Sequence, residues 1–214
     1  MPRGAEERAV RRALSRARRD IAVFASGIGP RAAARAADEA AAAPVRQALA
    51  TGLCGLLSPA FAVGDILVYR DVCRLDMTKL ELDRDLSVAV AARLRNVQSG
   101  IHALESDRLI TRAREKRTLR ERYGADAVDM ETWTTARRLQ DAGVALAALR
   151  VGSDGPGDDL PDLNRAVTSG GGINGLSFAR ACARRPVATL KLARNGMQAL
   201  RALERAVFEL VCAA

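Results

Sequence analysis

The chain has 214 residues, of which 49% are hydrophobic and only 3% aromatic, so we expect one domain whose core consists of alanine, leucine and valine. Its net charge of +9 comes from arginine, because the only lysines are Lys79, Lys116 and Lys191. A basic surface attracts anionic partners, but the chain lacks aromatic residues for base stacking, so no nucleic-acid partner is expected. No run of about 18 apolar residues and no apolar N-terminal segment are present, which predicts neither a spanning helix nor a secretory signal.

Cysteine and histidine usage indicates a cytoplasmic protein without a metal site. Cys54, Cys73, Cys182 and Cys212 are scattered, with no CxxC pair and no metal-ligand spacing, which is typical of reduced thiols. His102 is the only histidine and has no set of partner ligands around it. We therefore expect His102 to be structural, in a loop or at a strand edge, and no metal to be bound.

Hydrophobic periodicity and turn signals predict alternating helices and strands. Pro30 is expected at the first helical position of the second helix, and Gly143 at the end of the fifth. The predicted helices cover residues 6–20, 30–43, 85–95, 113–122, 131–141, 174–184 and 186–210, and the predicted strands cover 21–26, 48–57, 63–72, 125–130 and 144–154.

Several of these strands are apolar on both faces, which predicts an α/β sheet covered by helices on both sides. In such sheets ligands bind outside the carboxyl ends of the strands. The candidate site therefore consists of the segments that follow strands, at residues 26–30, 52–58, 129–131 and 150–154.

Four stretches, taken in order, resemble the nucleoside phosphorylase and nucleosidase superfamily over about residues 20–155: "SGIGPRAAARAA", "TGLCGLLSPAFAVGDILV", "REKRTLRERYGA" and "GADAVDMETWTTARRLQDAGVALAALRVGSD". That superfamily includes purine nucleoside phosphorylases and methylthioadenosine/S-adenosylhomocysteine nucleosidases. The tail "LPDL…RRPVATLKLARNGMQALRAL" resembles the hopanoid-associated branch, whose proposed activity is adenosylhopane cleavage.

The resemblance implies a single domain over residues 1–214, a three-layer αβα sandwich with a mixed, partly barrel-like central sheet. It implies cleavage of the N-glycosidic bond of a purine nucleoside, expected to be a 5′-modified adenosine. It also implies no cofactor, with inorganic phosphate as an alternative co-substrate to water, and assembly as a homo-oligomer.

By the same resemblance, Glu131 binds the ribose hydroxyls, Met130 packs on the sugar, and Asp154 contacts the purine with support from Ser153. Other interpretations stay open from the residues alone. Glu131 could be a helix-start acid that interacts with the helix dipole, Met130 ordinary core, and Asp154 a turn residue. Asp129 either helps at the sugar or only ends the strand.

The N-terminus departs from the family pattern, in which a first strand precedes a loop with a glutamate that activates water. Here "GAEERAV" resembles that loop, with Glu6 in the glutamate position and Glu7 as the alternate. Both acids could instead only favour the start of a helix. We expect that the first strand is missing from the sequence as given.

Two glycine loops are candidate sites for an anion or the attacking water. Gly27 and Gly29 could present backbone N–H groups at the following helix, or serve only as turn residues. Leu53 and Cys54 lie at the centre of the second loop, followed by Gly55, and an alkyl group and a thiol are poor phosphate ligands. This composition favours water over phosphate as the nucleophile, while Cys54 is also compatible with a small buried residue.

Two segments near the C-terminus have alternative interpretations. Residues 169–174, "SGGGIN", predict a linker or a substrate lid. The last helix predicts either packing on the sheet with a solvated basic face, or contact with a membrane surface. At the level of the whole chain, the alternative to an enzyme is a non-catalytic binding or interaction protein that keeps the nucleosidase fold.

Overall fold

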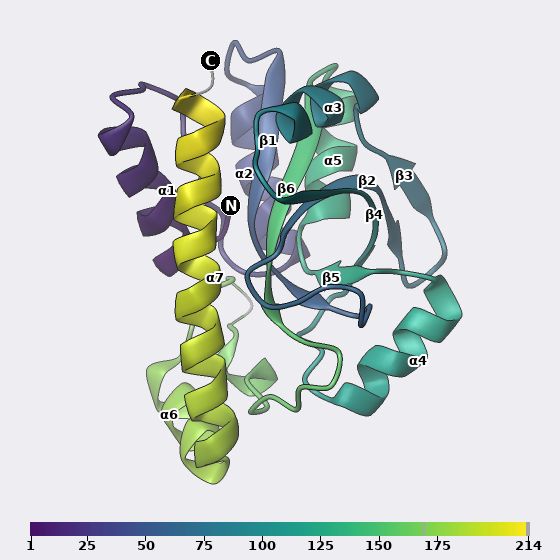
Figure 1. Cartoon of the computed structure of the whole chain (residues 1–214), viewed down its shortest axis with the longest axis vertical. Helices are drawn as coiled ribbons and strands as arrows, with labels where there is room; N and C mark the ends of the chain where they lie inside the picture. The colour runs from purple at the N-terminus through teal and green to yellow at the C-terminus, as the bar shows by residue number, and fades with distance from the viewer. Residues whose placement is uncertain (169, 213–214) are drawn as a thin grey trace.

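A computed structural model describes residues 1–168 and 170–212, and its centre is a mixed sheet that closes on itself (Figure 1). The strand order is β3-β2-β4-β5-β1-β6, and an additional antiparallel pairing of β2 with β6 closes five of the strands into a barrel, with β3 outside. The strands are β1 (Gln47–Leu56), β2 (Ile66–Arg74), β3 (Lys79–Glu81), β4 (Val97–Glu105), β5 (Ala127–Asp129) and β6 (Ala145–Asp154). This arrangement confirms the α/β class and the barrel-like mixed sheet.

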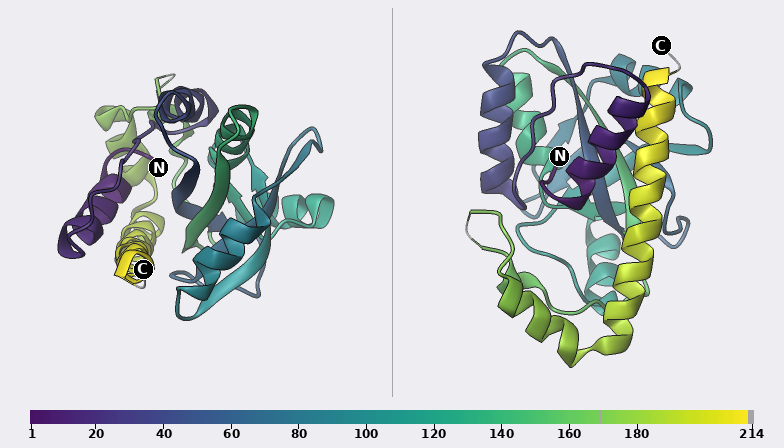
Figure 2. Two further views of the ribbon diagram at one scale, coloured as in Figure 1. Left: turned by 90° about the horizontal axis from the view of Figure 1, so that it is seen from above. Right: turned by 90° about the vertical axis from the view of Figure 1, so that its left-hand side faces the viewer.

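Helices cover the barrel on two sides. α7 packs over β6 with α1 beside it, whereas α2 and α5 pack together on the other side (Figures 1 and 2). The helices are α1 (Ala5–Arg16), α2 (Pro30–Ala41), α3 (Arg84–Ala92), α4 (Ala113–Tyr123), α5 (Thr132–Asp141), α6 (Gly175–Arg184) and α7 (Pro186–Cys212), with a short 3₁₀ turn at Asn164–Ala166.

Small residues form much of the contact between helices and barrel. Ala9 and Ala13 of α1 and Ala199, Ala202 and Ala206 of α7 are all at most 2% exposed and belong to one apolar cluster with β6. Because an alanine side chain adds little thickness, helix backbones can approach one another and the sheet closely. This explains how a core with few aromatic residues closes.

The prediction of a strand at residues 21–26 was wrong. This segment forms a single bridge, between Pro2 and Ser26, with backbone hydrogen bonds of 2.6 Å from Arg3 N to Ser26 O and 2.7 Å from Ser26 N to Met1 O. A strand needs a neighbour along its length, and here only three N-terminal residues run beside it.

Two strands were missed, and α1 and β5 are among the elements that are shorter than predicted. β4 was missed although Val97, Ile101 and Ala103 alternate with polar residues, which is a weak strand signal. β3 is only three residues long and gives no usable pattern. Helix α1 ends at Arg16 rather than at residue 20, because Arg18 adopts a left-handed conformation with φ of 52°. β5 keeps only three of the six predicted strand residues.

Candidate active site

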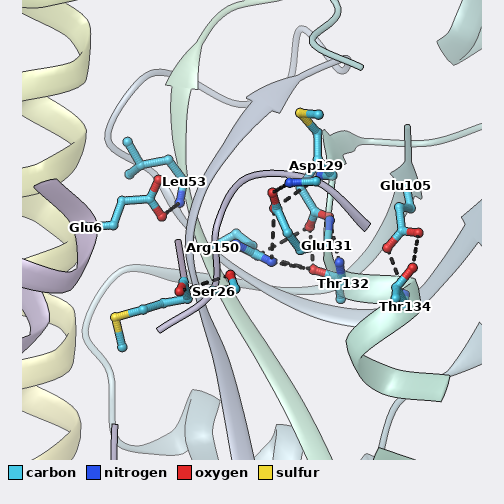
Figure 3. Close-up of polar contacts among 12 residues, drawn as sticks. Glu6, Ser26, Leu53, Glu105, Asp129, Glu131, Thr132, Thr134 and Arg150 are labelled. Atoms are coloured by element: carbon cyan, nitrogen blue, oxygen red, sulfur yellow. Dashed lines mark hydrogen bonds and ion pairs between the residues drawn. The ribbon is translucent and has the colours of Figure 1, made fainter. Parts of the chain in front are cut away.

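Arg150 is the central charge of a buried polar cluster at the barrel (Figure 3). It extends from β6, is 2% exposed, and lies 3.3 Å from a carboxylate oxygen of Asp129 and 3.9 Å from one of Glu131. Its Nη2 donates a 2.8 Å hydrogen bond to the hydroxyl of Thr132. Burial alone would lower the pKa of Arg150, but Asp129 and Glu131 outweigh burial and raise that pKa above its ordinary value.

Asp129 connects the end of β5 to the start of α5. Its Oδ1 accepts hydrogen bonds of 3.0 Å from the Glu131 amide and 2.9 Å from the Thr132 amide, and its Oδ2 accepts one from the Thr132 hydroxyl. A carboxylate in this position satisfies the free N–H groups of the helix start. Asp129 therefore holds the beginning of α5 and orients Arg150.

Glu131 lies at the start of α5, yet its side chain makes no capping bond to that helix. The carboxylate instead accepts hydrogen bonds of 2.9 Å from the amide of Gly29 and 3.3 Å from the amide of Met130. Burial raises its pKa, and Arg150 opposes that rise. The Met130 side chain lies beside Gly29, since its Cε is 3.7 Å from the position that a Cβ of Gly29 would occupy.

Glu6 enters the same cluster from the first turn of α1 (Figure 3). Its Oε2 accepts a 3.1 Å hydrogen bond from the amide of Leu53, and the predicted second glycine loop around Leu53, Cys54 and Gly55 is part of β1 rather than a loop. Loss of hydration raises the pKa of Glu6 to about 7, although Arg150 opposes the rise. Glu7 points away and forms a surface ion pair of 2.8 Å with Arg11, so of these two acids the fold brings only Glu6 to the cluster.

Gly52 allows Glu6 and Arg150 to converge on β1. A Cβ at this position would collide with Oε2 of Glu6 and would lie 2.6 Å from Nη1 of Arg150. The same Nη1 is buried and has no hydrogen-bond partner among the described residues. The Glu6 carboxylate and the Arg150 guanidinium therefore both lie against the backbone of Gly52. A larger residue at position 52 would displace one of them.

Asp154 lies further along β6, next to a second buried cation. Lys116 of α4 is fully buried, and its ammonium donates to Asp154 and to the carbonyl of Gly155 at 2.7 Å. The Ser153 hydroxyl lies 2.8 Å from Oδ1 of Asp154 and 3.0 Å from the carbonyl of Cys54.

The position of Asp154 depends on an irregularity in the β1–β6 pairing. Cys54 pairs with Gly152, but the next β1 residue, Gly55, pairs with Asp154, so β6 carries one extra residue there. Such a bulge changes the direction of the following side chain. A Cβ on Gly55 would be 3.2 Å from Oδ2 of Asp154, so glycine leaves room for the carboxylate.

The backbone of the first glycine loop is already engaged by protein groups. The Gly29 amide donates to Glu131, and the Ile28 amide donates a 2.8 Å hydrogen bond to Gly171. Gly27 and Gly171 touch so closely that a Cβ on Gly27 would lie 2.8 Å from the Gly171 carbonyl. Of the predicted linker or lid, residue 169 lies outside the described residues, and Gly171 is buried against this loop.

The surroundings of Cys54 and His102 indicate a structural role for each residue. Cys54 is 3% exposed, and burial raises the pKa of its thiol to about 12, so it carries no charge at neutral pH. His102, in β4, contacts Asp71 through Nδ1 and lies 3.2 Å from the Tyr123 carbonyl through Nε2. No group of histidine, cysteine and carboxylate side chains suited to a metal ion occurs in the described residues.

The sequence analysis assigned no role to four polar residues of this region, Lys116, Arg150, Thr132 and Glu105, although Arg150 begins the candidate segment 150–154. Arg150 had a usable signal, because it interrupts an apolar run that reads as a doubly buried strand, and a buried charge requires partners. Glu105 accepts hydrogen bonds of 2.8 and 2.6 Å from the amide and hydroxyl of Thr134, and burial raises its pKa to about 7. No sequence pattern pointed to the partners of Lys116 or Thr132.

Comparison with solved structures finds the same fold in nucleosidases. The 5′-methylthioadenosine/S-adenosylhomocysteine nucleosidase of S. pneumoniae is 16% identical, with a TM-score of 0.66 over 88% of this chain and 79% of that chain. The corresponding Helicobacter pylori enzyme is 17% identical, with a TM-score of 0.65 over 96% and 94%. Futalosine hydrolase of Helicobacter pylori is 18% identical, with a TM-score of 0.58 over 81% and 77%.

No curated protein matches the chain. A family model described as the phosphorylase superfamily, however, matches residues 2–172, which is more than half of the sequence. The match includes the N-terminal helix with Glu6, all six strands, and the segments that carry Glu131, Arg150 and Asp154. The chain therefore belongs to the phosphorylase superfamily.

Proposed function

We propose that this protein, acting as one domain over residues 1–214, uses water to cleave the N-glycosidic bond of a purine nucleoside. The observation that carries the proposal is the convergence of Glu6, Glu131 and Arg150 at one barrel site, with Asp154 further along the strand of Arg150. These groups match the needs of a reaction that creates positive charge on the ribose and negative charge on the base.

In this proposal, Asp154 and Lys116 supply a proton to the departing purine. Cleavage leaves an electron pair on the base, and a proton shared by this buried pair can neutralise it. Ser153 holds one oxygen of Asp154 in place. Because the C–N bond breaks as the proton arrives, the base leaves as a neutral purine.

In this proposal, Glu131 and Met130 bind the sugar. A carboxylate that accepts hydrogen bonds from ribose hydroxyls orients the sugar and stabilises an oxocarbenium-like transition state. Glu131 accepts bonds from two backbone amides, so its position is set before a substrate arrives. Met130 supplies an apolar surface beside it.

In this proposal, Glu6 activates the attacking water. A carboxylate with a pKa of about 7 can accept a proton from water at neutral pH. The unpartnered Nη1 of Arg150 points toward the same space and can hold that water. The oxygen of water then bonds to the anomeric carbon, and its proton passes to Glu6.

The charges around this space support water rather than phosphate as the nucleophile. Glu6, Asp129 and Glu131 are three carboxyl groups with a single guanidinium among them. A phosphate dianion would meet net repulsion there. The amides of Gly29 and Leu53, which could bind an anion, are already bonded to Glu131 and Glu6.

We extend the proposal to a 5′-modified adenosine as the substrate, with an adenosylhopane-type nucleoside as the specific candidate, and to a homo-oligomeric assembly. Support comes from the tail motif and from the similar structures named for methylthioadenosine, S-adenosylhomocysteine and futalosine. No cofactor enters the proposed reaction, since all proton transfers are assigned to side chains of the chain.

A base-release assay tests this function. The protein is incubated with 5′-methylthioadenosine, adenosine and inosine, with and without phosphate, and free base is separated by chromatography. We expect release without phosphate, and a loss of about 10²–10⁴-fold in Asp154→Asn but not in the exposed control Asp162→Asn. A strict phosphate requirement would overturn hydrolysis. Nucleoside binding without base release would instead support the non-catalytic alternative.

A further inference from the structure

The segment from Leu163 to Leu203 has an extreme charge bias. It contains seven basic residues and no aspartate or glutamate, although the whole chain has 25 acidic residues. The seven are Arg165, Arg180, Arg184, Arg185, Lys191, Arg194 and Arg201. Two of them are partly neutralised, because Lys191 pairs with Asp158 and Arg185 with Asp159. No ion pair to Arg180, Arg184, Arg194 or Arg201 occurs among the described residues.

The same segment exposes large apolar side chains. Six of the ten exposed large apolar residues in the described parts of the chain lie in it, with exposed fractions of 37–83%: Ile173, Leu176, Phe178, Val187, Leu190 and Met197. Helix α6 has no buried residue at all. α6 and the first half of α7 extend beyond the barrel (Figure 1).

Apolar and basic residues alternate along one side of α7. Val187, Leu190, Arg194, Met197 and Arg201 follow one another at intervals of three and four, which places them on a single helix face. We call these five residues, together with Leu176 and Phe178 of α6, the basic apolar face.

The basic apolar face lies on the opposite side of α7 from the core. The residues of α7 that pack on α1 and the barrel are Ala199, Ala202, Leu203, Ala206, Val207 and Leu210. They are centred roughly half a turn from Arg194 and Arg201. The second half of α7 therefore packs on the core, and its first half is exposed.

A hollow lined with arginine adjoins this face. It has a volume of about 540 Å³ between α1 and α7, and it is lined by Arg16, Arg194, Met197, Gln198, Arg201, Glu204 and Arg205. Glu204 is already bonded to Arg12 at 2.9 Å and to Arg16 at 3.4 Å. The remaining guanidinium groups have the planar donor geometry that suits phosphate oxygens.

We propose that the basic apolar face binds the surface of an anionic lipid bilayer. Exposed leucine, valine and phenylalanine side chains can enter the boundary between headgroups and acyl chains, while the arginines contact lipid phosphates. No α-helix within the described residues is long and apolar enough to cross a bilayer, so this contact is peripheral. This inference does not depend on the proposed reaction.

Two other occupants fit this face less well. A nucleic acid would match the arginines, but it would leave Val187 and Leu190 exposed without a stacking partner. A second copy of the chain would place two strongly basic segments against each other, which opposes association through this face. An anionic bilayer complements both the charge and the apolar side chains.

Vesicle flotation with the full chain tests this proposal. Vesicles of phosphatidylcholine alone are compared with vesicles that also contain phosphatidylglycerol, at low and high salt. We expect binding only to the anionic vesicles, and weaker binding at high salt. Val187→Ser/Leu190→Ser should weaken binding by about tenfold or more. Arg194→Gln/Arg201→Gln should weaken it by about 25-fold, at about fivefold per cation.

Exposed residues elsewhere supply matched controls. Val88→Ser on α3 and Arg114→Gln on α4 change the same residue types outside the basic apolar face, and they should float like the unmodified chain. Absence of flotation, or equal binding to both vesicle types, would overturn the proposal. The proposal would also be overturned if the chain bound no lipid and sedimentation showed that Val187→Ser/Leu190→Ser converts an oligomer into a monomer.

Discussion

Lys116 and Asp154 form a buried ion pair that joins α4 to the end of β6. Lys116 has no exposed surface and Asp154 is 6% exposed, so both charges are largely removed from water. The pair is also where the proposed reaction places the proton for the purine. Its structural and chemical roles can be separated by changing one partner or both.

Lys116→Met leaves the Asp154 carboxylate buried without its cation. We expect a loss of about 3–5 kcal/mol in the free energy of unfolding, measured by denaturant titration. The double variant Lys116→Met/Asp154→Asn removes both charges and should recover much of that loss. Additive losses in the single and double variants would show that the two groups are not coupled.

Glu6→Gln should slow base release by about 10²–10⁴-fold, because the amide cannot accept a proton from water. The matched control is Glu7→Gln, the next residue on α1, whose side chain forms only a surface pair with Arg11. That variant should keep near-normal rates and lose at most a few tenths of a kcal/mol in stability. Equal rates in the two variants would remove Glu6 from the mechanism.

The pKa of Glu6 sets the acid limb of the pH–rate profile. Because this pKa is raised to about 7 by loss of hydration, the carboxylate form needed to accept a proton is lost as the pH falls below about 7. kcat/KM should therefore rise with pH and level off above about 7. In Glu6→Gln the residual kcat/KM should no longer fall on the acid side. If the pH–rate profile is unchanged, the acid limb belongs to a group other than Glu6.

Gly52→Ala tests the close approach of Glu6 and Arg150. The added Cβ has no room beside either side chain, so we expect a large loss of base release, about 10²-fold for a displacement near 1 Å. Gly196→Ala in α7 is the matched control, because no atom lies within 4 Å of its Cβ position. Gly196→Ala should raise stability slightly, as expected for alanine in a helix.

Glu105 should make stability fall with rising pH. Burial raises its folded pKa to about 7 from 4.5, so the folded state holds the proton more tightly than the unfolded state. The contribution is therefore constant below about pH 4.5 and is lost as the pH rises through about 7, by about 3 kcal/mol in total. Denaturant titrations across this pH range give the free energy of unfolding. This free energy should fall less with pH in Glu105→Gln than in the unmodified chain. In the exposed control Glu121→Gln it should fall as steeply as in the unmodified chain.

Local patterns in the sequence predicted most of the elements. The helical spacing in 113–122 and 131–141 and the apolar runs in 48–57 and 144–154 match α4, α5, β1 and β6 within about two residues. The failures are segments whose state depends on a neighbour. Residues 21–26 are apolar enough for a strand but have only Met1–Arg3 beside them.

The candidate site could be predicted as a set of segments but not as a set of contacts. The strand ends pointed to Asp129, Glu131 and Asp154, and the structure places all three in buried polar contacts. The contacts with Arg150 and Lys116 could not be predicted, since they join residues up to 39 positions apart in the sequence. The choice between Glu6 and Glu7 likewise needed the direction of each side chain from α1.

By itself, the sequence determined the α/β class, the order of the motifs and the resemblance to the nucleosidases, because hydrophobic periodicity and turn residues act over short distances along the chain. Only the tertiary structure decided that β2 pairs with β6 to close the barrel, that Arg150 holds Asp129 and Glu131 together, and that the first half of α7 stays exposed. These features depend on which elements become neighbours, and burial against a neighbour decides whether a charge is paired or an apolar face is covered.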